Sequence, residues 1–478
     1  MVHRFVEVPE NVELKDYQNE AIEEWKKHSF CGYFDMATGT GKTFTALAGL
    51  ACFAKQKNGV AAAFIVCPYK HLVGQWEEDI VEWGGRPIVC HSESPEKEWN
   101  RKLQIAFKRF RQFGQPFICL TTNRSFVGDK IQEVVSQITN DMNVVFVVDE
   151  AHNFGATQLA RRLPLNISYR LGLSATFERF HDDDGTKALK DYFGKMCMKY
   201  TLEKAIADGK SLCPYEYYPL YTFLDDDELE QYERLTRKIL ENIIEEDGQK
   251  RLSEAGKLLA YKRARLLASA RNKTEVLKTH LQQYVNEKYI LIYCGATIFY
   301  DEDGTEKKLI EEITDIVNNE LGIKAHKFTS EEDMNERIML KEMFADGMYQ
   351  ALTAIKCLDE GVNIPNIRTA FIMASSRNPK EFIQRRGRLL RKAVGKKKAT
   401  IYDFVILPRQ LSKVKSGDFD SDKSIVMGEM SRIYEFGRLA LNPIETDRMI
   451  EEVQSAYDVR FDLDELRQYC EEELYEFS

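Results

Sequence analysis

A glycine-rich loop is the feature that most constrains what this chain can fold into. The loop reads Met36-Ala37-Thr38-Gly39-Thr40-Gly41-Lys42-Thr43. Glycines let backbone N–H groups turn inward onto phosphate oxygens, the lysine neutralises the β- and γ-phosphates, and the threonine hydroxyl can ligate Mg²⁺. Met36 stands where the pattern ordinarily has glycine or alanine, and the plainer interpretation is a glycine turn before a helix. Since phosphate loops follow a strand of a parallel sheet, the loop predicts an α/β domain.

Two adjacent carboxylates follow a strand-like apolar run. Asp149 and Glu150 come directly after residues 144–148 and open the segment Asp149-Glu150-Ala151-His152. Such a pair is usually a solvated turn, but carboxylates at the end of a buried strand are costly unless they have a role. Given the phosphate loop upstream, we expect Asp149 to hold Mg²⁺ through water and Glu150 to polarise an attacking water. His152 is expected to couple this site to its neighbours.

Two further motifs complete an ordered set. Leu173-Ser174-Ala175-Thr176 comes third, and Gln384-Arg385-Arg386-Gly387-Arg388-Leu389-Leu390-Arg391 comes last. Arg388 and Arg391 are three residues apart, so we expect them to share a helix face. From a second lobe they could reach the γ-phosphate as arginine fingers, and Gly387 permits close approach.

A basic surface helix is the alternative for the last motif, because the positive charge continues beyond the two candidate fingers. The additional basic residues are Arg385, Arg386, Lys392 and Lys396–Lys398. Both interpretations can hold together, with fingers inside and contacts to a phosphate backbone outside. In this order, the four motifs predict a motor that hydrolyses ATP while holding a nucleic-acid strand.

The chain resembles a superfamily 2 helicase of the DEAH-box kind from about residue 14 to 391. Motifs I, II, III and VI resemble segments 36–43, 149–152, 174–176 and 384–391. Leu14-Lys15-Asp16-Tyr17-Gln18 resembles the adenine-reading segment, with Gln18 able to pair with the adenine edge. Segments 67–76, 121–123 and 359–365 resemble motifs Ia, Ib and V. The last is similar to double-stranded-DNA members such as excision-repair and restriction motors, although Asn363 is often Asp in relatives.

The resemblance implies ATP and Mg²⁺ as cofactors and assigns roles to specific residues. It implies catalytic roles for Glu150, Asp149, Arg388, Arg391 and Gln384, and metal binding by Thr43 and Asp149. It implies nucleotide binding by Gln18, Thr38, Gly39, Thr40, Gly41, Lys42, Thr43 and Gly361. Strand contacts in the family go to the sugar-phosphate backbone, so we expect little sequence specificity.

The implied function is an ATP-dependent DNA helicase or translocase with two lobes that alternate their grip. We expect it to be the motor subunit of a DNA repair or antiviral restriction complex, with a nuclease or effector subunit as partner. Two alternatives stay open, an RNA helicase on the same scaffold and an ATP-gated DNA-binding subunit that recruits an effector.

Alternating apolar runs and helices predict an α/β fold with two RecA-like parallel-sheet lobes, a helical linker and a helical C-terminal extension. The expected boundaries are 1–205, 206–285, 286–408 and 409–478. Eight strands are expected, at 62–67, 117–121, 144–148, 169–173, 289–293, 351–355, 369–373 and 400–404. Few β-branched residues and much Leu, Glu, Lys and Arg favour helix in the linker.

Composition limits the class of protein. A chain of 478 residues with 44% hydrophobic and 30% charged residues suits two or three globular domains. The net charge of −9 predicts that any nucleic-acid track is a local basic stripe. Ten scattered cysteines without a Cys-x-x-Cys pair favour reduced thiols over a zinc module, and no apolar run is long enough to span a membrane. With no secretory signal, we expect a cytoplasmic protein.

Two basic stretches and an acidic tail have less specific interpretations. The stretch 99–111 places Trp99, Leu103, Phe107 and Phe110 on one helical face, which favours an amphipathic surface helix over a nucleic-acid contact. The stretch 257–273 is interpreted as a solvated helix, with a DNA-facing or bracing role as the alternative. The acidic region after 440 is expected to pack as helix, and partner docking is the lesser interpretation.

Overall fold

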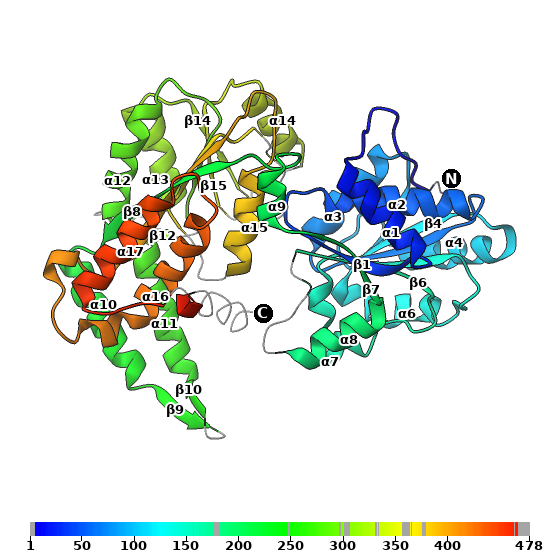
Figure 1. The fold of residues 1–478 in the computed structure, drawn as a ribbon, viewed down its shortest axis with the longest axis horizontal. Helices are drawn as coiled ribbons and strands as arrows, with labels where there is room; N and C mark the ends of the chain where they lie inside the picture. Colours follow the sequence, from blue (N-terminus) through cyan, green and yellow to red (C-terminus); the bar gives the residue numbers. More distant parts are fainter. Residues whose placement is uncertain are drawn as a thin grey trace. The chain divides into compact units, whose positions relative to one another are not determined.

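The computed structural model describes residues 5–155, 157–175, 177, 182–246, 249–295, 298–300, 306–329, 332, 334–355, 364, 366–374, 379–462 and 464–466. The chain divides into two compact units, Met1–Leu212 and Cys213–Ser478, each described here by itself (Figure 1). Each unit is built around its own parallel sheet.

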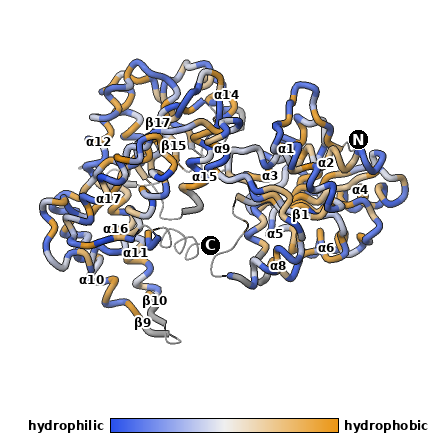
Figure 2. Tube along the Cα trace, in the orientation of Figure 1, coloured by the Kyte–Doolittle hydropathy of each residue, from blue (hydrophilic) through white to orange (hydrophobic). Residues whose placement is uncertain are grey.

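Unit 1 has a seven-stranded sheet in the order β3-β4-β2-β5-β6-β1-β7. Every neighbouring pair runs parallel. The strands are β1 (Cys31–Met36), β2 (Ala62–Cys67), β3 (Pro87–Cys90), β4 (Phe117–Thr122), β5 (Val144–Val148), β6 (Tyr169–Ser174) and β7 (Lys195–Tyr200). β2, β4 and β5 are buried along their whole length, as expected of central strands covered on both faces. In Figure 2 these strands form the most hydrophobic part of unit 1.

Helices connect the strands of unit 1. They are α1 (Asp16–Lys27), α2 (Lys42–Gln56), α3 (Lys70–Glu82), α4 (Trp99–Phe113), α5 (Asn123–Phe126), α6 (Asp129–Val135), the 3-10 turn η1 (Ala151–Gly155), α7 (Thr157–Ala160), α8 (Asp183–Phe193) and α9 (Leu202–Ala207). In α4, Leu103, Phe107 and Phe110 are buried and the basic residues are exposed, so the amphipathic interpretation is confirmed.

Unit 2 has a six-stranded parallel sheet in the order β14-β15-β11-β16-β17-β8. The strands are β8 (Tyr215–Phe223), β11 (Ile290–Tyr293), β14 (Ala325–Phe328), β15 (Ala351–Ala354), β16 (Thr369–Ile372) and β17 (Ala399–Leu407). β8 pairs with β17 over nine residues, although it lies within the segment expected to be a helical linker. Its sequence, YEYYPLYTF, is rich in aromatic residues that favour strands.

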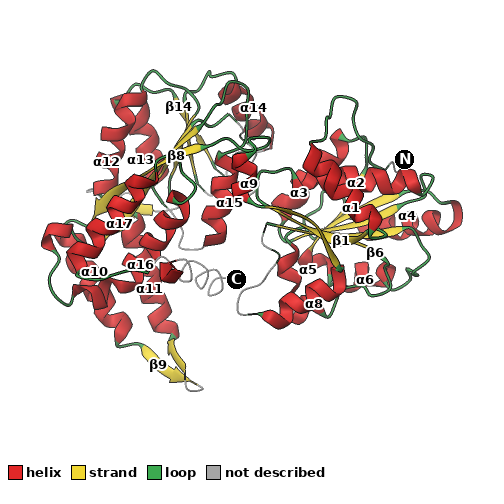
Figure 3. Ribbon diagram, viewed as in Figure 1, coloured by secondary structure: helices red, strands yellow, loops and turns green. Residues whose placement is uncertain are grey.

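Helices surround this second sheet. They are α10 (Asp226–Leu240), α11 (Glu254–Ala268), α12 (Asn272–Leu281), α13 (Leu309–Asp315), α14 (Met334–Ala345), α15 (Pro379–Leu389), α16 (Asp418–Gly437) and α17 (Pro443–Tyr457), with short turns η2 (Gln282–Tyr284), η3 (Ile316–Glu320) and η4 (Leu411–Lys413). Two hairpins are added, β9 (Ile243–Glu246) with β10 (Gln249–Leu252) and β12 (Ile298–Tyr300) with β13 (Glu306–Lys308). Figure 3 shows the β9–β10 hairpin beyond the ends of α10 and α11, where continuous helix was expected.

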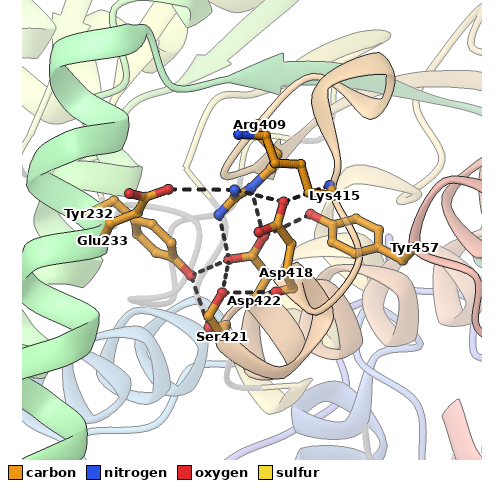
Figure 4. A network of polar contacts seen from close by, with 8 residues as sticks. All are labelled: Tyr232, Glu233, Arg409, Lys415, Asp418, Ser421, Asp422 and Tyr457. Carbon is orange, nitrogen blue, oxygen red and sulfur yellow. Dashed lines mark hydrogen bonds and ion pairs between the residues drawn. The ribbon is translucent and has the colours of Figure 1, made fainter.

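A buried charge network joins the C-terminal helices to the rest of unit 2 (Figure 4). The Arg409 guanidinium lies 2.8 Å from Asp418, 3.1 Å from Asp422 and 3.5 Å from Glu233. Tyr457 at the end of α17 donates a 3.0 Å hydrogen bond to Asp422. Arg409 therefore connects α10 to α16, and Tyr457 connects α17 to the same network. These contacts agree with the expectation that the region after residue 440 packs as helix.

The predicted fold class is confirmed, because both sheets are parallel and helices follow the second sheet. All eight predicted strands are present within one or two residues of their expected ends, apart from β17, which is longer. No helix among the described residues is long and apolar enough to cross a membrane. Over the same residues there is no group of three or more His, Cys, Asp or Glu that could hold a metal ion, and the eight described cysteines are free.

Candidate nucleotide-binding and catalytic site

The phosphate loop, residues 37–41, connects the carboxyl end of β1 to the first turn of α2. Gly39 and Gly41 adopt φ values of 85° and 84°, which side-chain-bearing residues rarely do. Thr40 is buried, and its hydroxyl donates to the Ala37 carbonyl at 2.6 Å, which closes the turn. The loop therefore delivers the unpaired N–H groups of a helix N-terminus to one point, the arrangement that binds phosphate.

The segment before the loop holds it in place. Tyr17 donates a 2.7 Å hydrogen bond to the Thr40 carbonyl and stacks on Tyr200 at 3.9 Å between ring centroids. Gln18 donates to Thr45 Oγ1 at 3.1 Å and to the Gly41 carbonyl at 3.4 Å, and its side-chain oxygen accepts from the Lys15 N–H at 3.0 Å. The Gln18 amide therefore braces the loop from within the protein. The pairing of Gln18 with adenine stays a prediction, and it requires exchange of at least one of these bonds.

The predicted lysine and carboxylates lie together in unit 1. Lys42 Nζ is 3.7 Å from Glu150 Oε1, and both side chains are mostly buried. Glu150 has a φ of 48°, a strained left-handed conformation for a residue with a side chain. Such strain persists only where surrounding contacts impose it, and it is frequent at functional sites. Here the Asn153 side chain donates to the Glu150 carbonyl at 3.0 Å.

Asp149 is buried at the end of β5, and each of its carboxylate oxygens has a donor. The Glu150 N–H donates to Oδ1 at 3.0 Å, and the Trp76 indole N–H donates to Oδ2 at 2.9 Å. Burial and, to a lesser extent, the Glu150 charge raise the pKa of Asp149 to about 6, although Lys42 and the Trp76 hydrogen bond act in the opposite direction. Trp76 ends the segment 67–76 that resembles motif Ia, and no pattern in the sequence indicates that its indole N–H binds Asp149.

His152 connects the acidic segment to β6. Its Nδ1 lies 3.0 Å from Ser174 Oγ and 3.5 Å from Glu150 Oε2. His152 thus contacts both the acidic segment 149–152 and the segment 174–176, and its expected coupling role stays a prediction. Thr176, the last residue of the third motif, lies outside the described residues.

The residues of unit 1 fit a magnesium nucleotide. The Lys42 ammonium is buried and makes no hydrogen bond within the described part of the chain, so its N–H groups can donate to an anionic ligand. The Thr38 hydroxyl is likewise buried without a hydrogen-bond partner among those residues. Thr43, in the first turn of α2, and Asp149 are the oxygen donors that would hold the metal.

The arginine-rich motif lies in unit 2, on and just after α15. Arg385 donates to Tyr293 Oη at 3.1 Å, with its guanidinium 3.9 Å from the Tyr293 ring centroid. Arg386 is buried and pairs with Glu435 at 2.7 Å. Lys396 is buried too, so contacts from Arg385, Arg386 and Lys396 to an outside phosphate backbone are ruled out in this structure. These three side chains make their hydrogen bonds within unit 2 instead.

The expectation that Arg388 and Arg391 share a helix face is wrong. α15 ends at Leu389, so Arg388 lies in its last turn and Arg391 follows the helix. The carbonyls at and just after the end of the helix are bound from elsewhere in unit 2. Lys396 Nζ donates to the carbonyls of Leu389 at 2.5 Å and Arg391 at 2.9 Å, and the Cys213 N–H donates to the Leu390 carbonyl at 2.8 Å.

The structure describes only some of the remaining predicted site residues. Gln384 is half-buried on α15, and Arg388 is buried except for a small part of its surface. Gly361, with most of segment 359–365, lies outside the described residues. The roles of Gln384, Arg388 and Arg391 at a nucleotide bound to unit 1 stay predictions, because the two units are described separately.

The fold and the phosphate loop define a class, namely nucleotide-binding proteins with two RecA-like lobes. Two family models match the chain, "Type III restriction enzyme, res subunit" over residues 11–179 and "Helicase conserved C-terminal domain" over residues 272–393. The first match contains the phosphate loop and the Asp149–Glu150 pair, and the second contains the arginine-rich motif. Together with the relatives below, these two matches indicate a superfamily 2 helicase related to DNA translocases.

Individual proteins resemble the chain over most of its length. DNA 3'-5' translocase XPB2 of Sulfurisphaera tokodaii is 27% identical over 406 residues, which cover 80% of each chain. The solved structure of the ATP-dependent type ISP restriction-modification enzyme LlaBIII bound to DNA has a TM-score of 0.61 at 14% identity. That alignment covers 94% of this chain and 33% of the enzyme. The Pyrococcus furiosus Hef helicase domain has a TM-score of 0.52 at 16% identity and covers 86% of this chain and 98% of that domain.

Proposed function

We propose that this chain is an ATP-hydrolysing DNA translocase that moves on the sugar-phosphate backbone. It would serve as the motor subunit of a restriction, antiviral defence or DNA repair assembly in the cytoplasm, with a nuclease or effector subunit as partner. The free cysteines are in keeping with a reducing compartment.

One observation carries the proposal, the buried Lys42 ammonium beside the phosphate loop. It lies 3.7 Å from Glu150 and makes no hydrogen bond within the described part of the chain. A buried ammonium without hydrogen bonds is costly unless a ligand supplies the acceptors. Phosphate oxygens bound at the N-terminus of α2 would do so, which supports ATP as the ligand.

The proposal gives a role to each residue around the phosphate loop. Lys42 would neutralise the β- and γ-phosphates, and Thr43 and Asp149 would hold Mg²⁺, which offsets negative charge on the phosphates. Glu150 would orient and deprotonate the attacking water, because its carboxylate lies beside Lys42. Arg388 and Arg391 would add positive charge to the transferred phosphate once the two units close on it.

DNA is supported as the track by the proteins that the chain resembles. XPB2 is named a DNA translocase, and LlaBIII was solved bound to DNA. The net charge of −9 means that the track must be local and its binding sensitive to salt. Segments 67–76 and 121–123 supply candidate strand contacts at the ends of β2 and β4.

The test is a comparison of ATPase rates with four polynucleotides under identical salt. We expect duplex DNA to stimulate turnover more than single-stranded DNA or RNA, and Glu150→Gln to remove turnover with every polynucleotide. Stimulation by RNA alone would favour the RNA helicase instead. A wild-type protein that shows no turnover with single-stranded, duplex or forked DNA, or with RNA, would contradict the proposal.

A further inference from the structure

We infer that Trp76 is a positioning residue that holds the Asp149 carboxylate in the orientation that receives the magnesium ion. This inference rests on the proposed function, because it assigns a partner to the metal-binding carboxylate of that same site. It concerns one hydrogen bond within unit 1, from the indole N–H of α3 to the end of β5.

The hydrogen bond between Trp76 and Asp149 is buried. Trp76 is 1% exposed, and its Nε1 lies 2.9 Å from Asp149 Oδ2. The other oxygen accepts the Glu150 N–H at 3.0 Å. A carboxylate has about four acceptor positions, so each oxygen keeps one lone pair for a metal ion or its water. Two fixed donors therefore set the rotation of the carboxylate without consuming its capacity to bind metal.

A partner of this kind has a known physical effect. Residues that hydrogen-bond a metal-binding group fix its orientation before the metal arrives. Without the indole, the Asp149 carboxylate would keep one donor, on the backbone of its own neighbour, and could rotate about its side-chain bonds. The loss should appear in metal affinity before it appears in nucleotide affinity, because the hydrogen bonds described for the phosphate loop do not involve Trp76.

The chain supplies two matched controls. Trp83 ends the same helix and is equally buried, but its indole nitrogen makes no hydrogen bond among the described residues. Trp25 is fully buried and donates to the Arg170 carbonyl at 2.9 Å, away from the carboxylates. Trp83→Phe thus removes an unbonded indole N–H, and Trp25→Phe removes a bonded one elsewhere in unit 1.

The experiment measures Mg²⁺ dependence of the binding of a fluorescent, non-hydrolysable ATP analogue to the full chain. We expect Trp76→Phe to raise the Mg²⁺ concentration for half-saturation roughly 10- to 100-fold, while affinity in EDTA stays unchanged. Trp83→Phe and Trp25→Phe should match the wild type, and Trp76→His, which keeps a ring N–H, should recover part of the loss. The inference is overturned if Trp76→Phe requires no more Mg²⁺ than Trp83→Phe.

A measurement on the wild type covers the case in which Trp76→Phe does not fold. The chain has four tryptophans, so ¹⁵N-labelled indoles give four N–H signals, which the other three Trp→Phe variants assign. We expect the Trp76 signal to shift when Mg²⁺ is added to the nucleotide complex, and the Trp25 signal to stay. A Trp76 signal that does not shift would contradict this inference but not the proposed function. A wild-type protein that binds no nucleotide, with or without Mg²⁺, would contradict the proposed function as well.

Discussion

At the scale of residues, the site is a set of mostly buried charged groups beside the phosphate loop. Lys42 faces Glu150 at 3.7 Å, beyond ordinary hydrogen-bond distance, and Glu150 is held with a φ of 48°. Asp149 has a raised pKa because it is buried next to a second carboxylate. Each feature costs stability in the free protein, which is expected where residues are arranged in advance for a bound nucleotide.

Replacing the lysine tests this arrangement. We expect Lys42→Ala to lower ATP turnover by at least about 100-fold, with little loss of thermal stability, because the ammonium makes no hydrogen bond in the described part of the chain. Steady-state ATPase rates and a melting curve check both parts. Lys55→Ala, on the exposed last turn of the same helix, serves as control. ATP turnover near the wild-type rate in folded Lys42→Ala would contradict the proposal that Lys42 binds the phosphates.

The arginine after α15 gives a second prediction. We expect Arg391→Ala to keep ATP affinity and lose turnover, by roughly 10³- to 10⁵-fold if it acts as an arginine finger. Lys392→Ala, which changes the exposed neighbouring residue, should behave as wild type. Nucleotide titration and single-turnover hydrolysis separate binding from chemistry. An unchanged kcat in Arg391→Ala would contradict the proposal that Arg391 acts as an arginine finger.

The sequence alone predicted the residues whose type and spacing point to one kind of chemistry. It did not predict residues whose role depends on a contact that forms only in the folded protein. Gly39, Gly41 and Lys42 have few other uses in that spacing. Trp76 could equally have been a core side chain, because only the fold brings its N–H to Asp149. The same limit applies to Arg386, which the alternative interpretation of its motif placed on a surface and which pairs with Glu435 inside unit 2.

At the scale of elements, buried strands were predictable and helix ends were not. β2 and β5 are uniformly apolar, so local composition gives their positions. α15 ends two residues before Arg391, and Lys396 and Cys213 bind the carbonyls at and just after its end. Cys213 comes from a segment more than 170 residues earlier, which local propensity cannot anticipate.

A buried lysine in the first turn of α12 gives a prediction about pH. Lys273 is 4% exposed and donates to the Ala268 carbonyl at 3.2 Å. Burial lowers the pKa of Lys273 from 10.5 to about 8, so between those pH values the unfolded chain binds more protons than the folded one. The contribution of Lys273 to the free energy of unfolding therefore rises with pH through this window and is lowest below pH 8.

Replacing Lys273 with methionine should reduce that dependence. We expect Lys273→Met to raise the unfolding free energy of unit 2 near pH 7 by about 3 kcal/mol, and to reduce the increase between pH 8 and 10 to the share that comes from Lys396, whose pKa burial also lowers to about 8. Lys278→Met, one turn later and paired with Glu320 at the surface, is the control. Denaturant titrations at several pH values check the effect. A variant less stable than wild type at pH 7 would show that the lysine is net stabilising.

At the scale of the whole molecule, the chain is two parallel-sheet units with different additions. The sequence predicted both sheets, because each has apolar runs between helices. It did not predict that β8 completes the second sheet, since β8 pairs with β17 more than 180 residues later. Nor did it predict the β9–β10 hairpin within the helical region. The boundary between the units lies at Leu212, a few residues after the expected one, while the further division of unit 2 at 285 and 408 stays a prediction.

Movement along DNA is the central claim, and displacement of a third strand from duplex DNA tests it most directly. A triplex-forming oligonucleotide is bound at one end of a linear duplex, and its release is followed after addition of ATP. The account predicts ATP-dependent release by the wild type, with a lag that grows with distance, and no release by Glu150→Gln. Turnover stimulated by the same duplex without release would contradict translocation and leave a DNA clamp that hydrolyses ATP in place.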